Sequence, residues 1–206
     1  MPRWAWLALV IALAGALAWH ATRRTTVVGG DVVCTLPPPF VDASTPLQSD
    51  VAGMAPFRLG RAQVTPLAGI SLEARVLSRR DYSSGNEAEF SPTDLALGWG
   101  PMAAADITDR LDITQSGRWY QYRWENSAPM PPAQIARNSA NMHLVPADAD
   151  VAALLAAVRE GDTVQVEGWL VRIDRDDGWH WRSSLRRDDT GSGSCELVYV
   201  CALRSR

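Results

Sequence analysis

The chain has 206 residues, enough for one domain with a sizeable core once a short targeting segment is set aside. It carries 20 basic and 23 acidic residues, for a formal net charge of −3, and every basic residue is arginine. This near balance gives no electrostatic reason to expect a nucleic-acid partner. Three of the nine tryptophans lie in the N-terminal segment, which leaves six for the domain.

The first feature along the chain is a membrane-targeting segment over residues 1–24. Residues 4–19 are uncharged, have tryptophan at both ends, and are flanked by arginine. As a helix they span about 24 Å, a little less than the ~30 Å hydrocarbon core. Two interpretations stay open: an uncleaved single-pass anchor in the inner membrane, which we favour, and a signal peptide cleaved after Ala16-Leu17-Ala18. Both export the rest of the chain, so we expect a periplasmic or secreted domain.

Residues 25–62 are rich in proline, glycine, serine and threonine and include the run Pro37-Pro38-Pro39. Such composition predicts an extended tether that holds the domain away from the bilayer. The soluble domain then covers residues 63–206, and its pattern of elements indicates an α+β fold.

Three cysteines constrain the fold. Cys195 and Cys201 flank the run ELVYV, which is typical of a strand. Six residues of strand span about 20 Å, whereas a disulfide needs Cα atoms within ~7 Å, so these two cannot pair. A disulfide, if one forms, joins Cys34 to one of them and leaves a free thiol. The spacings that bind zinc are absent from the sequence, and we expect neither a metal nor a cofactor.

The first half of the domain begins with alternating apolar residues over 70–76, which predict a strand. Ser91-Pro92 has the pattern of a helix start, so we expect a short helix from there to Gly98, and a second from Pro101 to about Leu111. Residues 118–124 alternate again and predict a strand. Residues 141–145 predict another extended segment, which Pro146 ends.

The second half begins with the clearest helix. Apolar residues at 151, 154, 155 and 158 form one face of a helix over about 148–160, which Asp148 or Asp150 caps and Gly161 follows. Residues 163–173 predict a long strand whose apolar parity changes at Gly168. A one-residue bulge there would keep all its apolar side chains on one face. Residues 179–185 and 196–203 predict two more strands.

This order, strands with one helix before the long bent strand, resembles an oligosaccharide/oligonucleotide-binding barrel. The resemblance implies a small, mostly antiparallel, barrel-like domain. Four motifs also make the chain similar to a group of uncharacterised bacterial membrane-anchored proteins: LALGWG (95–100), QSGRWY (115–120), SANMHL (139–144) and DTGSGSCE (189–196). That second resemblance implies a class and a location and no activity.

One set of candidate residues suits catalysis. A cysteine with a histidine supplies a thiol nucleophile and its base, here Cys195 with His143 or His180. The alternative is that the thiol is structural and that the histidines hydrogen-bond within the core. No helix start or flanking cation that would activate the thiol is evident in the sequence, so the structural interpretation is favoured.

A second set suits binding, because aromatic rings interleaved with arginine can stack sugars or bases. The candidate ligand-binding residues are Arg118, Trp119, Asn141, His143, Trp179, His180 and Trp181. The competing view is that tryptophan fills a small core. The first hypothesis is thus a non-enzymatic binding or assembly domain tethered to the membrane, with an envelope protein, peptide or glycan as partner. The alternatives are a small envelope hydrolase and a cytoplasm-facing module that binds nucleic acid.

Overall fold

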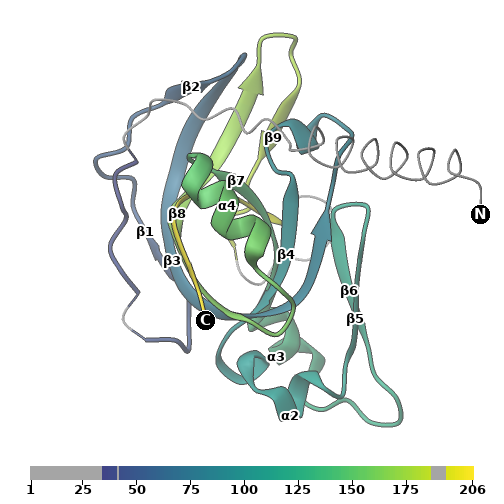
Figure 1. Cartoon of the computed structure of the whole chain (residues 1–206). Helices are drawn as coiled ribbons and strands as arrows, with labels where there is room; N and C mark the ends of the chain where they lie inside the picture. The colour runs from purple at the N-terminus through teal and green to yellow at the C-terminus, as the bar shows by residue number, and fades with distance from the viewer. Residues whose placement is uncertain (1–33, 41, 187–193) are drawn as a thin grey trace, which may run out of the picture.

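The computed structural model of the chain describes residues 34–40, 42–186 and 194–206 (Figure 1). The predicted targeting segment, residues 1–24, lies outside the described residues. Among the helices of the described part, none is long and apolar enough to cross a membrane.

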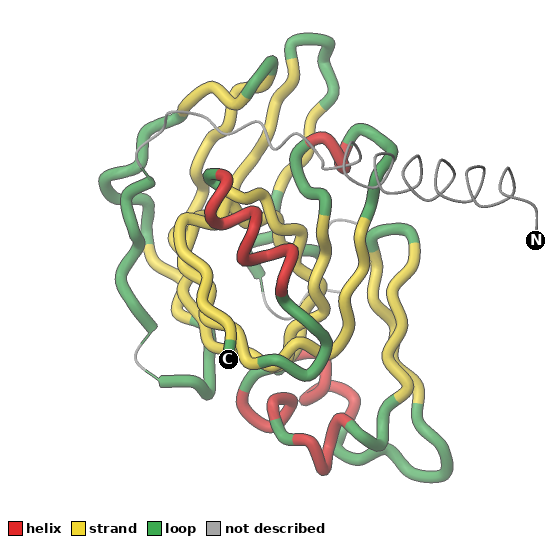
Figure 2. Tube along the Cα trace, viewed as in Figure 1, coloured by secondary structure: helices red, strands yellow, loops and turns green. Residues whose placement is uncertain are grey.

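The fold is mixed α+β with strands in the majority, and its centre is a ring of strands (Figures 1 and 2). Hydrogen bonding runs β3-β4-β7-β10-β8 and closes through a pairing of β8 with β3. All these pairs are antiparallel except β7 with β10, which is parallel. The ring strands are β3 (Ala62–Asp81), β4 (Thr93–Gly98), β7 (Ser139–Pro146), β8 (Thr163–Arg175) and β10 (Glu196–Ser205).

Apolar side chains from all five ring strands fill the inside of the ring, and helix α4 (Ala149–Ala157) packs against them. Asp148 caps this helix by accepting a hydrogen bond from the backbone N–H of Val151 at 2.8 Å. Val151 and Leu155 are buried as the apolar spacing predicts, but Leu154 is 46% exposed. The helix therefore presents a narrower buried face than the sequence suggests.

The predicted bulge at Gly168 is wrong, because β8 alternates without a break. Val164, Val166 and Leu170 face the inside of the ring, and the odd-numbered residues from Trp169 to Ile173 face a second apolar cluster on the outside. The irregularities lie in the partners: β3 bulges near Leu67 and β10 near Cys201. Gly168 is needed for another reason, since a Cβ there would collide with the backbone oxygen of Tyr199.

The helix predicted from Ser91-Pro92 is also wrong. Residues 93–98 form β4, every residue of which is buried. Leu95 and Leu97 point into the ring while Ala96 packs outside it against a third apolar cluster. A strand covered on both faces loses its polar–apolar alternation, which is why this segment does not look like a strand in the sequence.

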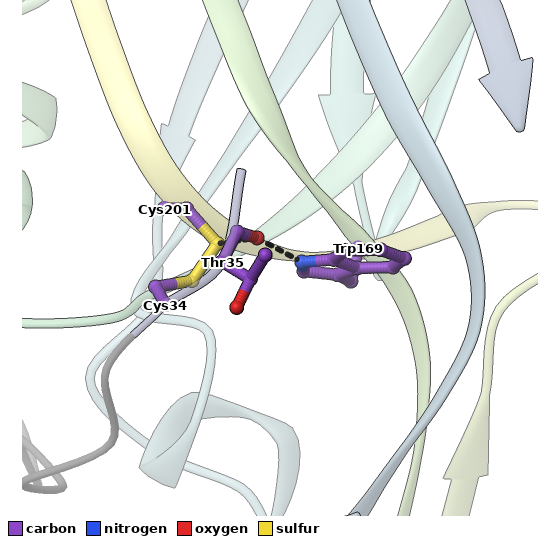
Figure 3. The surroundings of a disulfide bond; sticks show 4 residues. All are labelled: Cys34, Thr35, Trp169 and Cys201. Atoms are coloured by element: carbon purple, nitrogen blue, oxygen red, sulfur yellow. Dashed lines mark hydrogen bonds between the residues drawn. A yellow bond between two sulfur atoms is a disulfide. The ribbon is translucent and has the colours of Figure 1, made fainter. Parts of the chain in front are cut away.

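The described part of the predicted tether lies against the domain. Strands β1 (Leu47–Ser49) and β2 (Phe57–Leu59) both pair with β3. A disulfide joins Cys34 to Cys201 across 167 residues, with Cα atoms 5.5 Å apart, so a pairing allowed by the sequence is confirmed (Figure 3). Next to it, Trp169 donates its indole N–H to the carbonyl oxygen of Thr35 at 2.8 Å. From Cys34 onward the segment is thus part of the fold, because sheet pairing and a covalent bond hold it.

A separate hairpin stands beside the ring (Figures 1 and 2). It consists of β5 (Asp112–Ser116) and the predicted strand β6 (Trp119–Arg123), which pair with each other and form a sheet of their own. Its inner face packs on the third apolar cluster, around Ala96 and Ile135. Short elements complete the described part of the chain: η1 (Glu87–Glu89), η2 (Gly100–Ala103), α2 (Ala105–Thr108), α3 (Pro132–Arg137) and β9 (His180–Arg182).

Candidate functional site

The outer face of β4, β7 and β10 carries a buried group of polar side chains beneath the tip of the hairpin. Sheet register sets their positions: Asp94 lies opposite His143, and Ala96 opposite Asn141. On the other side of β7, Leu197 lies beside His143, which brings Cys195 to the level of Asn141. Asp94, Asn141 and His143 are each at most 3% exposed.

Asp94 is the charged centre of this group and is completely buried. Its Oδ1 accepts a hydrogen bond from Nη1 of Arg118 at 2.6 Å. Nδ1 of His143 lies 3.0 Å from the same oxygen, an ion-pairing distance, although the ring is not aligned for a hydrogen bond. Within the described residues, the other carboxylate oxygen, Oδ2, has no hydrogen-bond partner. A buried carboxylate needs a cation, and Arg118 supplies the permanent one.

Arg118 occupies the tip of the hairpin in a two-residue turn. Gly117 and Arg118 have φ angles of 58° and 70°, the combination that a tight hairpin turn requires. Positive φ is unfavourable for a residue with a Cβ, so the site holds Arg118 in a conformation that costs about 1–2 kcal/mol. Its contacts with the ring offset that cost.

Arg118 has partners for its backbone N–H, for its carbonyl oxygen and for part of its guanidinium. Its backbone N–H donates to the hydroxyl of Tyr82 at 3.1 Å. Its carbonyl accepts from Nδ2 of Asn141 at 2.9 Å and from Sγ of Cys195 at 3.7 Å. Its guanidinium donates to Asp94 and to the carbonyl of Ser91, and lies 3.8 Å from the centroid of the Tyr82 ring. Arg118 is therefore recognised through both its backbone and its side chain.

Aromatic rings continue the site toward β9. The rings of His143 and Trp181 are 4.7 Å apart, and those of Trp181 and Trp179 are 6.2 Å apart. Trp179 stacks on Phe90 with nearly parallel rings at 5.8 Å. Trp179 and Trp181 are half-buried, so these rings can offer part of their surface to a ligand. An unbroken series of contacts thus joins the hairpin tip to Phe90.

Two phenols in or near the site have raised pKa values. Burial raises the pKa of Tyr120, on the inner face of the hairpin, to about 12. The Tyr120 hydroxyl is 2.8 Å from Oγ of Ser139 on β7. Burial also raises the pKa of Tyr82, so both phenols stay neutral near pH 7. In the described part of the chain no three His, Cys, Asp or Glu side chains are grouped as a metal site.

Five of the seven predicted ligand-binding residues come together here, and two do not. Arg118, Asn141, His143, Trp181 and Trp179 are joined through direct contacts. Trp119 is 38% exposed and is on the outer face of the hairpin. His180 is exposed and lies opposite Asp174 on β8, so it does not share the face of Trp181.

The catalytic candidates converge only in part. Cys195 precedes Leu197, the neighbour of His143, by two residues. A strand spacing of ~4.8 Å and a two-residue rise of ~6.6 Å put the Cα atoms of Cys195 and His143 about 8 Å apart. The thiol of Cys195 donates to the carbonyl oxygen of Arg118, a contact that helps to hold the hairpin tip in place.

Sequence reasoning missed Asp94, Tyr82 and Ser91. Asp94 is part of the segment that was interpreted as a helix, where an acidic residue near the start is ordinary. A charged residue directly before a continuous apolar run, DLALGW, was the available signal.

The chain has no match among known protein families, curated proteins or solved structures. The interpretation of the site therefore depends on its own geometry.

Proposed function

We propose that the chain is a non-enzymatic binding or assembly domain, tethered to the inner membrane by residues 4–19 and exposed to the periplasm. One observation carries the proposal: a continuous series of contacts links Asn141, Arg118, His143, Trp181 and Trp179. Partly exposed tryptophan beside arginine is a surface suited to peptides and sugars.

The strand order supports a binding fold. With β3 as the first ring strand, the chain follows the order of an oligosaccharide/oligonucleotide-binding barrel, and α4 falls between the third and fourth strands. Such barrels bind ligands on the face of strands two and three and in the loops after strands one and four. Here these are the outer faces of β4 and β7, the loop with Tyr82 and Phe90, and the segment with Trp179 and Trp181.

The disulfide supports the periplasmic location. Disulfides persist in oxidising compartments and are rare in the bacterial cytoplasm. A Cys34–Cys201 bond is consistent with export, and export makes an envelope protein, peptide or glycan a more suitable partner than nucleic acid.

Site-specific photo-crosslinking in intact cells tests the proposal. A photoreactive residue replaces Arg182, which is exposed and follows Trp181, in the full-length chain. The control chain has the same residue in place of exposed Leu154 on α4. We expect a discrete adduct from position 182 that disappears when Trp181→Ala is added, and none from position 154. Equal adducts from both positions, or an adduct that Trp181→Ala leaves unchanged, would contradict a binding site at this face.

The second candidate is a small hydrolase that uses Cys195 with His143. The 3.0 Å approach of Asp94 to His143 favours it, because a carboxylate beside a histidine supplies two of the three members of a catalytic triad. If it is correct, Cys195 alkylates rapidly below pH 8, and His143→Gln slows the reaction. Slow alkylation that does not depend on His143 rejects this candidate.

A further inference from the structure

The contacts of Arg118 have the form of a receptor that holds a ligand. Four parts of the chain supply them: the β3–β4 loop, β4, β7 and Cys195, just before β10. They recognise an N–H, a carbonyl and a guanidinium, which together describe one arginine within a peptide. The hairpin that presents this arginine has no strand pairing with the ring.

The fit of this occupant is incomplete. Arg118 uses one guanidinium nitrogen, Nη1, for Asp94, while Nη2 is buried without a hydrogen-bond partner among the described residues. Oδ2 of Asp94 is likewise unmatched. Arginine and a carboxylate pair most strongly through two parallel hydrogen bonds, and the turn geometry of Arg118 does not achieve this. The positive φ of 70° adds a conformational cost that a free peptide would not have.

We propose that this site is a receptor for an arginine-containing peptide segment of a partner protein, and that the hairpin tip occupies it as a weaker internal ligand. The inference rests on the proposed binding function and names the ligand class of the same site. An incoming arginine that approaches freely can place both guanidinium nitrogens on Asp94 and stack on Tyr82. Its backbone takes the hydrogen bonds from Asn141 and to Tyr82, and the hairpin tip moves away.

The specificity follows from the groups present. Lysine has a single ammonium group, which cannot form two parallel hydrogen bonds with a carboxylate. It also lacks the planar guanidinium that stacks on the ring of Tyr82. Citrulline keeps the shape of arginine without its charge, and would leave the carboxylate of Asp94 unpaired. Binding should therefore prefer arginine to both.

The test uses the full-length chain in mild detergent and a labelled peptide, acetyl-Ser-Gly-Arg-Trp-amide, with citrulline and lysine versions as controls. Arg118→Gly empties the site and relieves the positive φ. We expect this variant to bind the arginine peptide about tenfold more tightly than either control peptide, and Asp94→Asn to remove the preference. Bound peptide should also slow alkylation of Cys195, whose thiol contacts the carbonyl of the occupant.

The unmutated chain supplies the second measurement and needs no folded variant. Because its own hairpin competes, we expect it to bind the arginine peptide about tenfold more weakly than Arg118→Gly does. Peptide should then speed amide hydrogen exchange in residues 112–123. Equal affinity of Arg118→Gly for the arginine and citrulline peptides would overturn the inference. So would equal exchange rates for residues 112–123 of the unmutated chain in the arginine peptide and in the citrulline peptide at about 1 mM each. A Trp181-dependent crosslink together with either failure would leave the binding function standing and remove arginine as the ligand.

Discussion

Breaking the pair between Arg118 and Asp94 should be among the most damaging single changes in the domain. Arg118→Met keeps most of the stem and removes the charge, which leaves a carboxylate that is 0% exposed without its permanent cation. Removing one partner of a buried pair typically costs about 3–5 kcal/mol. The 16% exposure of the arginine side chain places the expected loss near the lower end, about 3 kcal/mol.

A double-mutant cycle separates the pair from general damage. Asp94→Asn alone should also destabilise the domain, but Arg118→Met with Asp94→Asn should cost clearly less than the sum, because no buried charge is then unpaired. Unfolding free energies come from urea titrations followed by tryptophan fluorescence. Arg123→Met, on the exposed face of β6 in the same hairpin, is the matched control and should change stability by less than about 0.5 kcal/mol. A coupling energy under about 0.5 kcal/mol would refute the claim that this pair fastens the hairpin.

Three further outcomes are expected. Replacing Cys34 and Cys201 by serine opens a covalent loop of 167 residues. We expect the unfolding free energy to fall by up to about 5 kcal/mol relative to the oxidised chain. An unchanged unfolding free energy would mean that the disulfide does not form. Gly168→Ala should lower the unfolding free energy by about 1–3 kcal/mol in the same titrations, because the added Cβ would collide with the backbone carbonyl oxygen of Tyr199. Burial raises the pKa of Tyr120 and Tyr199 to about 12. Because unfolded tyrosine ionises near pH 10, the stability they contribute is complete below pH 10 and is lost as the pH rises toward 12. Phenylalanine at both positions should flatten that decline, and an unchanged decline would assign it to other groups.

The sequence predicts the elements whose pattern is simple. Alternation predicts β6 and the central part of β3, and the spacing of apolar residues with an aspartate cap predicts α4. These elements have one buried face and one that is more exposed, so that burial leaves a period in the sequence.

Two strands that are buried on both faces differ from their predictions: β4 was predicted as a helix, and β8 as a strand with a bulge at Gly168. β4 is buried on both sides, and β8 buries its even and odd residues in different clusters, so neither shows the pattern of a half-exposed strand. The prolines between Cys34 and Leu59 predict an extended tether, yet an extended chain is also the conformation that an added edge strand needs. In these cases composition predicts the local backbone conformation. Whether the segment packs on the domain depends on the strand that it pairs with, which the sequence does not show.

Residue type predicts which side chains to consider for the candidate site. Arg118, Asn141 and Trp181 are polar or aromatic residues in predicted strands, and the fold brings them together although Arg118 lies in the hairpin turn. Asp94 is not predicted with them, because its role depends on the hairpin packing over β4, which brings Arg118, 24 positions further along the chain, to its carboxylate. A buried charged residue can be assigned to a site only when its counter-ion is known, and sequence spacing does not identify the counter-ion.

The arrangement of Arg118 links the fold to the proposed binding. A purely structural clamp would be expected to satisfy its buried donors and acceptors, as buried polar groups in folded proteins almost always do. Here one guanidinium nitrogen and one carboxylate oxygen remain unmatched within the described residues, beside an arginine held at positive φ. Unmatched groups and backbone strain gather where a structure is built to exchange partners. The same two atoms are therefore both the weak point of the hairpin contact and the feature that an incoming arginine would use.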